Sequence, residues 1–373
     1  MFPVLESLEQ PPSDTRPEAL PAQVTNESTI ALLDELEALS EAEVQRLLAA
    51  ENPAGNIPDA ATNIPRNSAF DCPDAKSEWF GRRHCNLIIV INKDFEAESF
   101  ERVVDHVREF DPLIHAVVRR DQTSTGRHLP VHPTLTFSPA ILRHPDPSLG
   151  RIFCGYPMSK SEEYSILEKA GIGVPKWILL KEGPTPDLGC FGEYVVRKPD
   201  YGGKGAEVAV MRKGRVRWKP ITTYAAGMST EMIVQEFIRT GRQPVSYRVN
   251  TLFGKALYSL RHQGTRLAEP TDGGASVVAS ARGAQASFNY DEEIIRLAET
   301  AAAAFPDIPL LGFDIIREFP SGKLYVLEAN AIGYVWNFHR QHRADYGFSL
   351  ETQFNGVRKA AYILAEATQQ HAA

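Results

Sequence analysis

The sequence of 373 residues predicts an α/β protein. Between about residues 81 and 155, short apolar runs typical of buried strands alternate with a segment of helical periodicity. After residue 177 the pattern changes to strands and hairpins, interrupted by one clear helix. The composition, with 43% hydrophobic and 23% charged residues, is typical of a soluble globular chain. A chain of this length can form two or three compact units.

The charge and composition argue against several classes of function. The net charge is −7 and no strongly basic domain is visible, so we expect no nucleic-acid partner. No apolar run approaches the roughly 18 residues of a membrane span, and Met1–Gln10 does not resemble a signal peptide. The cysteines lack zinc-ligand spacing, which favours free thiols in a reducing compartment and a cytoplasmic location; they are Cys72, Cys85, Cys154 and Cys190.

The first 80 residues are predicted to be an extension of the main body. Residues 1–27 are rich in Pro, Glu, Ser and Thr, and we expect them to be disordered. Ser28 to Glu51 has apolar residues at helical spacing and ends before Asn52-Pro53. This helix could pack against the main body or pair in a homodimer, and the sequence leaves both open.

Residues 81–155 predict a small Rossmann-like domain with a parallel sheet. The apolar run Asn86–Asn92 is typical of a strand buried on both faces. Phe95–Phe110 follows as a helix, and further strands are predicted at 113–118, 134–137 and 151–155. No GxGxxG follows the first strand, so the dinucleotide-binding fingerprint is absent.

The remaining residues predict a helix, a set of hairpins and two further helices. The first helix covers Met158–Ala170, and strands begin at Trp177–Leu180. After the helix Asp291–Phe305, the turn Pro320–Gly322 joins strands at 311–317 and 323–327. A final helix is expected at about 350–369.

A glycine-rich loop lies between two of these strands. The run that ends in Lys198 is followed by Gly202, Gly203, Lys204 and Gly205, and then by the strand Glu207–Met211. Glycine permits close approach and positive φ, so such a loop can lay backbone N–H groups over phosphates, with Lys198 and Lys204 adding positive charge. A flexible hairpin tip with solvated lysines explains the loop equally well. It is not a Walker A loop.

Two acidic segments suggest the rest of a nucleotide site. In Ile233–Ile238, Glu236 could accept a hydrogen bond from an adenine amino group or bind ribose, or it could be an exposed acid on an edge strand. Glu328 and Asn330 are two apart and face one side of their strand, and Asp314 can lie opposite them. These oxygens suit Mg²⁺ held together with phosphates. The alternative is a surface ladder of polar residues.

Taken in order, these motifs resemble the ATP-grasp superfamily. Within it they are most similar to the glutamate-adding ligases that modify ribosomal protein tails, and more distantly to D-alanine–D-alanine ligase and glutathione synthetase. The resemblance covers roughly Tyr156 to the C-terminus. It implies a small lobe at about 156–238 and a large lobe at about 239–373 that hold ATP between them, after a pre-ATP-grasp domain at 81–155.

The resemblance also implies roles for individual residues. Lys160 and Lys198 would contact phosphates, the loop Gly202–Gly205 would cover them, and Gln235, Glu236, Phe237 and Ile238 would hold adenine and ribose. Asp314, Glu328 and Asn330 would be ligands of Mg²⁺, with Mn²⁺ as an alternative metal. Arginines would stabilise the transferred phosphate and the intermediate; these are Arg248, Arg261 and Arg282.

The segment after Asn330 differs from the resembled family. The family often shows Asn-x-x-Pro-Gly there, whereas this chain has Gly333 without the proline, so known substrate specificities do not transfer. Aromatic and basic residues follow that could bind substrate carboxylates or form a basic helix face; they are Tyr334, Trp336, His339, Arg340 and Arg343.

The implied reaction is the ATP-dependent joining of a carboxylate to an amine through an acyl phosphate, with release of ADP and phosphate. The expected substrate is an amino acid or a peptide tail, with no nucleic acid and no membrane as partner. Two alternatives remain open. One is an ATP-grasp kinase that phosphorylates a small molecule, and the other is a nucleotide-binding module without catalysis.

Overall fold

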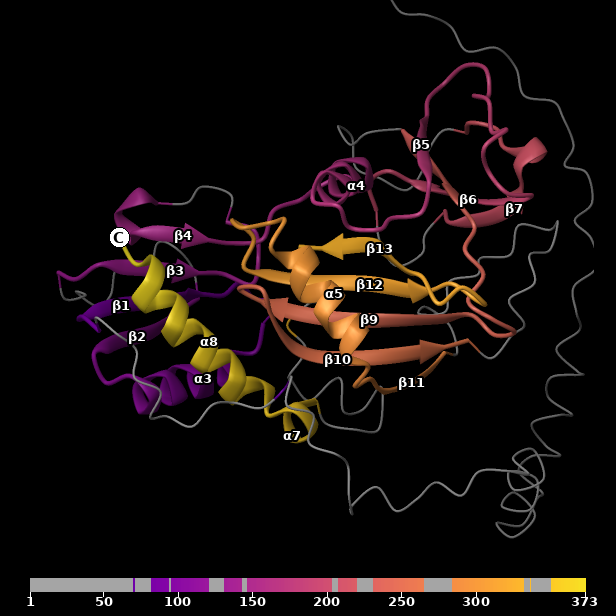
Figure 1. The fold of residues 1–373 in the computed structure, drawn as a ribbon. Helices are drawn as coiled ribbons and strands as arrows, with labels where there is room; N and C mark the ends of the chain where they lie inside the picture. The colour runs from indigo at the N-terminus through magenta and orange to yellow at the C-terminus, as the bar shows by residue number, and fades with distance from the viewer. Residues whose placement is uncertain are drawn as a thin grey trace, which may run out of the picture. The chain divides into compact units, whose positions relative to one another are not determined.

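The computed structural model describes residues 70, 82–93, 95–120, 131–142, 146–202, 207–219, 231–264, 284–331, 336 and 350–373 (Figure 1). All of them belong to one compact unit, Arg66–Ala373. The predicted disordered segment 1–27 and the helix 28–51 lie outside the described residues. Among the helices described, none is both long and apolar enough to cross a membrane.

The first sheet is four-stranded and entirely parallel, as predicted. All six residues of β1 are buried, in keeping with its continuous apolar run. Helix α3 (Ala97–Phe110) connects β1 to β2 and buries its apolar residues. The strand order is β2-β1-β3-β4, and the strands are β1 (Cys85–Val90), β2 (Ile114–Arg119), β3 (Thr134–Phe137) and β4 (Arg151–Phe153).

The last helix of the chain covers this parallel sheet. Helix α8 (Gly356–His371), preceded by α7 (Leu350–Phe354), packs against α3 and β1, and Figure 1 shows it beside α3. The Tyr362 ring lies edge-on to Phe110, with centroids 5.5 Å apart. The Gln369 amide donates to Asp111 Oδ2 at 2.9 Å. Residues near the C-terminus therefore pack with the first sheet. The domain boundary near residue 155 and the lobe boundary near residue 238 stay predictions.

The second sheet is four-stranded and antiparallel, with the order β5-β8-β6-β7. Its strands are β5 (Trp177–Leu180), β6 (Tyr194–Pro199), β7 (Ala209–Arg212) and β8 (Met232–Glu236). Short 3₁₀ turns lie at Lys213–Arg215 after β7 and at Pro147–Leu149 before β4. Helix α4 (Lys160–Lys169) precedes this sheet, and the Ser159 side chain caps it by accepting from Glu162 N at 3.2 Å.

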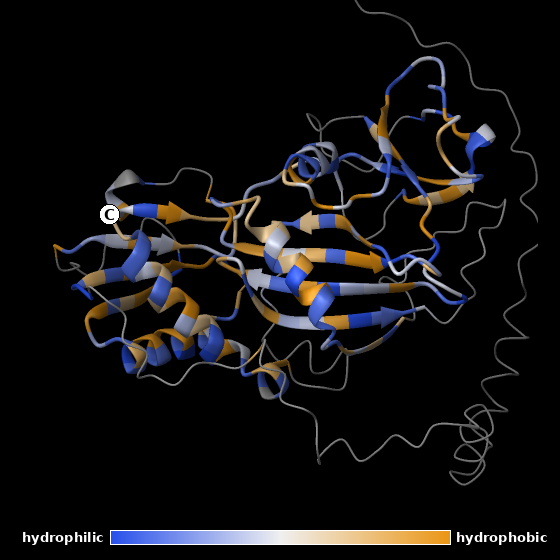
Figure 2. Ribbon diagram, viewed as in Figure 1, coloured by the Kyte–Doolittle hydropathy of each residue, from blue (hydrophilic) through white to orange (hydrophobic). Residues whose placement is uncertain are grey.

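The third sheet is five-stranded and antiparallel, with the order β11-β10-β9-β12-β13. Helix α5 (Glu292–Ala302) packs against β9, β10 and β12. Val249, Phe313 and Ala329 are cross-strand partners and are fully buried, and β12 is mostly apolar in Figure 2. The strands are β9 (Val245–Leu252), β10 (Lys255–Gln263), β11 (Gln285–Phe288), β12 (Leu310–Arg317) and β13 (Leu324–Asn330).

Strand β13 contains a β-bulge at Leu327. Asp314 pairs with Glu328, but the next residue of β12, Ile315, pairs with Val326. Leu327 is thus an extra residue without a partner on β12, and its carbonyl is free of the regular ladder. The predicted hairpin between β12 and β13 is confirmed, with this irregularity beside the predicted metal ligands.

Gly155 lies at a close approach between two segments, and its replacement by alanine is expected to destabilise the protein. A Cβ atom there would lie 2.5 Å from the Ala331 carbonyl oxygen, immediately after β13. We expect the free energy of unfolding to fall by about 1–3 kcal/mol, measured by urea denaturation. Gly192→Ala is the matched control, because its Cβ would meet nothing within 4 Å. Equal stability of the two variants would contradict this contact.

Candidate active site

A row of charged residues crosses the third sheet on the face opposite α5. Arg248 pairs with Asp314, and Asp314 pairs with Glu328, on β9, β12 and β13. Cross-strand partners project to the same face, so the three side chains lie side by side. Arg248 donates to both Asp314 oxygens, from Nε at 2.5 Å and from Nη2 at 2.8 Å. Burial alone would lower the pKa of Arg248, but the Asp314 carboxylate raises it above its ordinary value.

Lys160 joins this row from helix α4. Its Nζ lies 3.2 Å from Glu328 Oε1 and donates to the Gly202 carbonyl at 2.6 Å. The lysine is 7% exposed, so its charge is held close to these two partners. Lys160 therefore links β13 to the beginning of the glycine-rich loop, of which Gly202 is described and Gly203, Lys204 and Gly205 lie outside the described residues.

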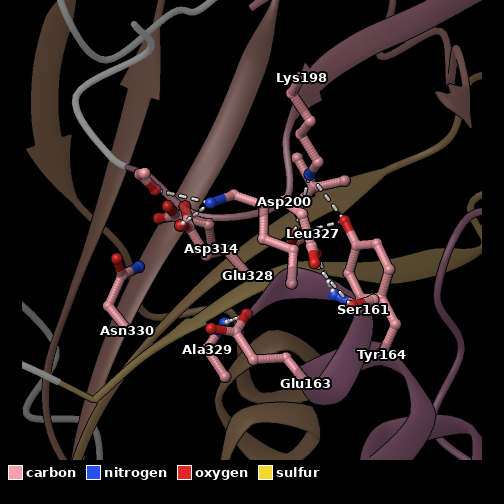
Figure 3. Close-up of polar contacts among 12 residues, drawn as sticks. Ser161, Glu163, Tyr164, Lys198, Asp200, Asp314, Leu327, Glu328, Ala329 and Asn330 are labelled. Atoms are coloured by element: carbon pink, nitrogen blue, oxygen red, sulfur yellow. Dashed lines mark hydrogen bonds and ion pairs between the residues drawn. The ribbon is translucent and has the colours of Figure 1, made fainter. Parts of the chain in front are cut away.

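Lys198 enters the same region from β6. Its Nζ donates to the Tyr164 hydroxyl at 2.7 Å and to the carbonyl of the bulge residue Leu327 at 3.4 Å. Figure 3 shows these three groups meeting, with Glu328 nearby. Burial lowers the pKa of Lys198 to about 8, and the Glu328 carboxylate opposes that shift. The charge row and both predicted phosphate lysines are thus brought together.

Asp200 fixes the helix of Lys160 to the strand of Lys198. Its Oδ1 accepts from Ser161 N at 2.8 Å and its Oδ2 accepts from the Ser161 hydroxyl at 2.9 Å. Its carbonyl accepts from Lys160 N at 2.9 Å. The residue is 3% exposed and follows β6 directly. The carboxylate and the carbonyl of Asp200 therefore each satisfy one backbone donor in the first turn of α4, and they tie that turn to the end of β6.

Glu163, on the same helix, contacts the backbone between the two predicted metal ligands of β13. Its Oε2 accepts from Ala329 N at 3.0 Å, and Figure 3 shows the two residues facing each other. Burial, with a smaller contribution from the neighbouring Glu328 carboxylate, raises the pKa of Glu163 to about 8. Glu163, Tyr164 and Asp200 were not predicted from the sequence. Tyr164 lies one helical turn after Lys160, which was the only local signal for it.

Glu163→Gln is expected to remove a loss of stability that the wild-type chain shows as the pH rises to about 8. The pKa of Glu163 in the folded chain is about 8, above the roughly 4.3 of an unfolded glutamate. The stability that protonated Glu163 contributes to the folded chain is therefore complete below the unfolded pKa. It is lost as the pH rises from there through about 8. Glutamine keeps the oxygen acceptor for Ala329 N without the titration. Urea unfolding between pH 5 and 9 should show wild type losing stability relative to the variant; parallel curves would contradict this.

The predicted adenine hinge lies at the end of β8. The Gln235 side chain is 4% exposed, and its Oε1 accepts from the Tyr164 hydroxyl at 2.7 Å. Glu236 N donates to the Lys176 carbonyl at 2.8 Å, and Phe237 N to the Tyr194 carbonyl at 3.4 Å. The side chain of Ile238 packs in a small apolar cluster with Ile316, Tyr325 and Leu327.

Two predicted residues lie elsewhere. Leu260, not Arg261, is the partner of Arg248, so Arg261 projects to the other face of the sheet, where its partner is Tyr247. Trp336 is 1% exposed and stacks on Phe100, with ring centroids 4.6 Å apart, inside the core. From the sequence, Arg261 was expected in the catalytic site and Trp336 in the substrate site. Other predicted residues lie outside the described residues; they are Arg282, Tyr334, His339, Arg340 and Arg343.

The donor chemistry of Asp314, Glu328 and Asn330 fits Mg²⁺. The described residues contain no group of three His, Cys, Asp or Glu that could hold a metal, so these two acids would act with the amide oxygen of Asn330. Asn330 Nδ2 donates to the Gly312 carbonyl at 3.1 Å, which fixes the amide on the same strand pair. Carboxylate oxygens keep lone pairs beyond those used by Arg248 and Lys160, so a metal and these cations can share them.

Several solved structures are similar to this chain. D-cycloserine synthetase DcsG is 15% identical, with a TM-score of 0.46 over 76% of this chain and 99% of that one. D-alanine–D-alanine ligase from Bacillus anthracis is 14% identical, with a TM-score of 0.43 and the same coverage. The ATP-grasp ligase PsnB, complexed with a precursor peptide and AMPPNP, is 14% identical, with a TM-score of 0.44 over 75% of this chain and 98% of that one.

These similarities assign no reaction, substrate or residue role to this chain. No protein-family model matches the chain, and no curated protein sequence does. The strand pairing by itself gives a mixed α/β protein in which a parallel sheet precedes two antiparallel sheets, in agreement with the ATP-grasp arrangement expected from the motifs.

Proposed function

We propose that the chain is an ATP-dependent carboxylate–amine ligase that forms an amide through an acyl phosphate and releases ADP and phosphate. The observation that carries the proposal is the meeting of Lys160, Lys198 and Arg248 with Asp314 and Glu328, from α4, β6, β9, β12 and β13. Cations and acids brought together from distant segments can bind a polyphosphate and its metal together.

Each charged residue has a role in this proposal. Lys160 and Lys198 are donors for phosphate oxygens, and Arg248 offers paired donors to the acyl phosphate and the tetrahedral oxyanion. Asp314, Glu328 and Asn330 would hold Mg²⁺, which when bound neutralises charge on the β- and γ-phosphates. The roles of Arg282 and the remaining glycine-loop residues stay predictions from the resemblance, and Arg261 is given no role because it projects to the other face of the sheet.

The bond changes are those of two successive displacements. A substrate carboxylate oxygen bonds to the γ-phosphorus while the bond to the β–γ bridging oxygen breaks and ADP leaves. The amine then bonds to the acyl carbon, the carbon–oxygen bond to phosphate breaks, and the amine loses a proton to solvent. The protein has mainly to position the reactants and balance charge.

The substrate is proposed only as a class. An amino acid or a peptide tail would provide the carboxylate, and the predicted contacts for it are Tyr334, His339, Arg340 and Arg343. No nucleic-acid or membrane partner is proposed. A cytoplasmic location and a homodimer also stay predictions.

A screen for ADP release tests the function. Amino acids and dipeptides are offered in pairs with ATP and Mg²⁺, with Glu328→Ala as the blank and hydroxylamine added to trap acyl phosphate as a hydroxamate. A ligase gives ADP, phosphate and hydroxamate that the blank lacks. A phosphorylated product without hydroxamate would indicate the kinase alternative, and nucleotide binding without turnover in any pair would indicate a non-catalytic module. ADP that appears equally in the blank would contradict the metal assignment.

A further inference from the structure

The Tyr164 hydroxyl is a point at which three separate parts of the candidate site meet. Lys198 Nζ donates to it at 2.7 Å, and it lies 2.7 Å from both Gln235 Oε1 and the Leu327 carbonyl oxygen. These residues belong to β6, to the predicted hinge at the end of β8, and to the bulge in β13. The tyrosine itself comes from α4 and is fully buried.

The bulge lies at this meeting point. Leu327 has no partner on β12, and β13 is the edge strand of its sheet, so the Leu327 carbonyl is available to another element. Both Tyr164 and Lys198 reach that carbonyl. A buried acceptor without a donor is costly, so the irregular strand and these two side chains depend on one another.

Lys198 makes two hydrogen bonds with side-chain or backbone oxygens among the described residues, and the bond to the Tyr164 hydroxyl is the shorter of the two. Lys198 is 8% exposed, and burial of a charged amine is unfavourable unless oxygen acceptors surround it. Tyr164 OH at 2.7 Å and Leu327 O at 3.4 Å supply such acceptors. Within the described part of the chain, these contacts use two of the three N–H donors of the ammonium group, and the proposal below assigns the third to an anion.

We propose that Tyr164 is a positioning residue of the nucleotide site, which fixes the Lys198 ammonium group against the bulged strand. The inference rests on the proposed function, because it assigns Lys198 to the nucleotide. Tyr164 does not touch the phosphates itself. It acts through Lys198, so its effect on nucleotide binding requires that lysine.

A double-mutant cycle tests this dependence through binding of the non-hydrolysable analogue AMPPNP with Mg²⁺, measured by calorimetry. Tyr164→Phe keeps the buried ring and removes only the hydroxyl. It should weaken AMPPNP binding by about tenfold or more, since a hydrogen bond to a charged group is lost. In a Lys198→Met background the same change should alter affinity by less than about twofold. An equal loss in both backgrounds would show that Tyr164 acts through packing and would overturn the proposal, as would an unchanged affinity of Tyr164→Phe.

Tyr290→Phe is the matched control, because it removes another hydroxyl that accepts a side-chain hydrogen bond, here from Gln353. Thermal melting of each variant verifies that the chain is folded. AMPPNP affinity should be unchanged in the control. A loss equal to that of Tyr164→Phe would mean a non-specific effect and would also overturn the proposal.

The pH profile of AMPPNP affinity gives a readout that altered packing alone would not move. Affinity should fall as Lys198 loses its proton, and Tyr164→Phe should move that fall to lower pH, because an acceptor that favours the ammonium form is absent. The charged groups that face Lys198 are Glu328, Lys160, Glu163 and Asp314, and all are retained in the variant. Superimposable profiles would overturn the proposal.

The two failures can be told apart. If the wild-type chain binds AMPPNP but forms no amide from any substrate pair, the proposed ligase function is wrong. The double-mutant cycle can still be measured in that case, because it uses AMPPNP affinity alone. A wild-type chain that makes an amide but gives an additive cycle would remove the role of Tyr164 alone.

Discussion

Replacing Glu328 with glutamine is expected to reduce ATP-dependent turnover by about 10²- to 10³-fold, because it removes a negative charge at the centre of the site. Glu328 lies 3.2 Å from Lys160 and is the cross-strand partner of Asp314. A carboxamide at this position is a weaker ligand for Mg²⁺ and leaves the Lys160 charge without its counter-charge. Steady-state ADP release with the best substrate pair is the measurement.

Glu366→Gln is the control for that change. Glu366, on α8, forms an ion pair with Lys255 of β10, and the same chemical change there should leave turnover as in wild type. If Glu328→Gln kept turnover within a few-fold of this control, Glu328 could not be a metal ligand of the reaction.

Arg248→Met is expected to lower both stability and turnover. Asp314 would lose both hydrogen bonds of its bidentate partner while remaining three-quarters buried, since its side chain is 25% exposed. We expect the free energy of unfolding to fall by about 2 kcal/mol and ADP release to fall by about 10²-fold or more. Arg248→Lys keeps the charge without the paired donors and should give an intermediate loss of turnover.

The double variant Arg248→Met with Asp314→Asn separates the two effects. Removing both charges avoids a buried, unpaired carboxylate, so urea unfolding should recover most of the lost stability. Turnover should stay low, because neither the arginine nor the metal ligand is present. Recovery of turnover together with stability would mean that the pair has only a structural role.

Local patterns were sufficient to predict most of the strands. The apolar run before Asn92 and the turn Pro320–Gly322 predicted β1 and the hairpin of β12 and β13, and the structure confirms both. The two-residue spacing of Glu328 and Asn330 predicted that they share a face. These features depend on residues close together in the chain, where periodicity and turn chemistry are informative.

Contacts between distant segments could not be predicted in this way. Glu163 reaches Ala329 across 166 positions, and no periodicity indicates that contact. Arg261 was expected in the site because it matches a second arginine of the resembled family. The pairing of β9 with β10 decides which face it occupies, and a shift of one residue reverses that face. The packing of α8 on the parallel sheet is likewise invisible to a local pattern.

The extra residue in β13 has a consequence for how the chain tolerates changes in length. Shortening β13 by Leu327 alone would make Val326 and Glu328 consecutive, opposite Ile315 and Asp314, which are already their partners. Every existing cross-strand pair would survive, and the ladder would become regular. The hairpin therefore does not need this residue for its own folding. The deletion would instead be harmful outside the sheet. Tyr164 of helix α4 and Lys198 of strand β6 would both lose their contact with the Leu327 carbonyl.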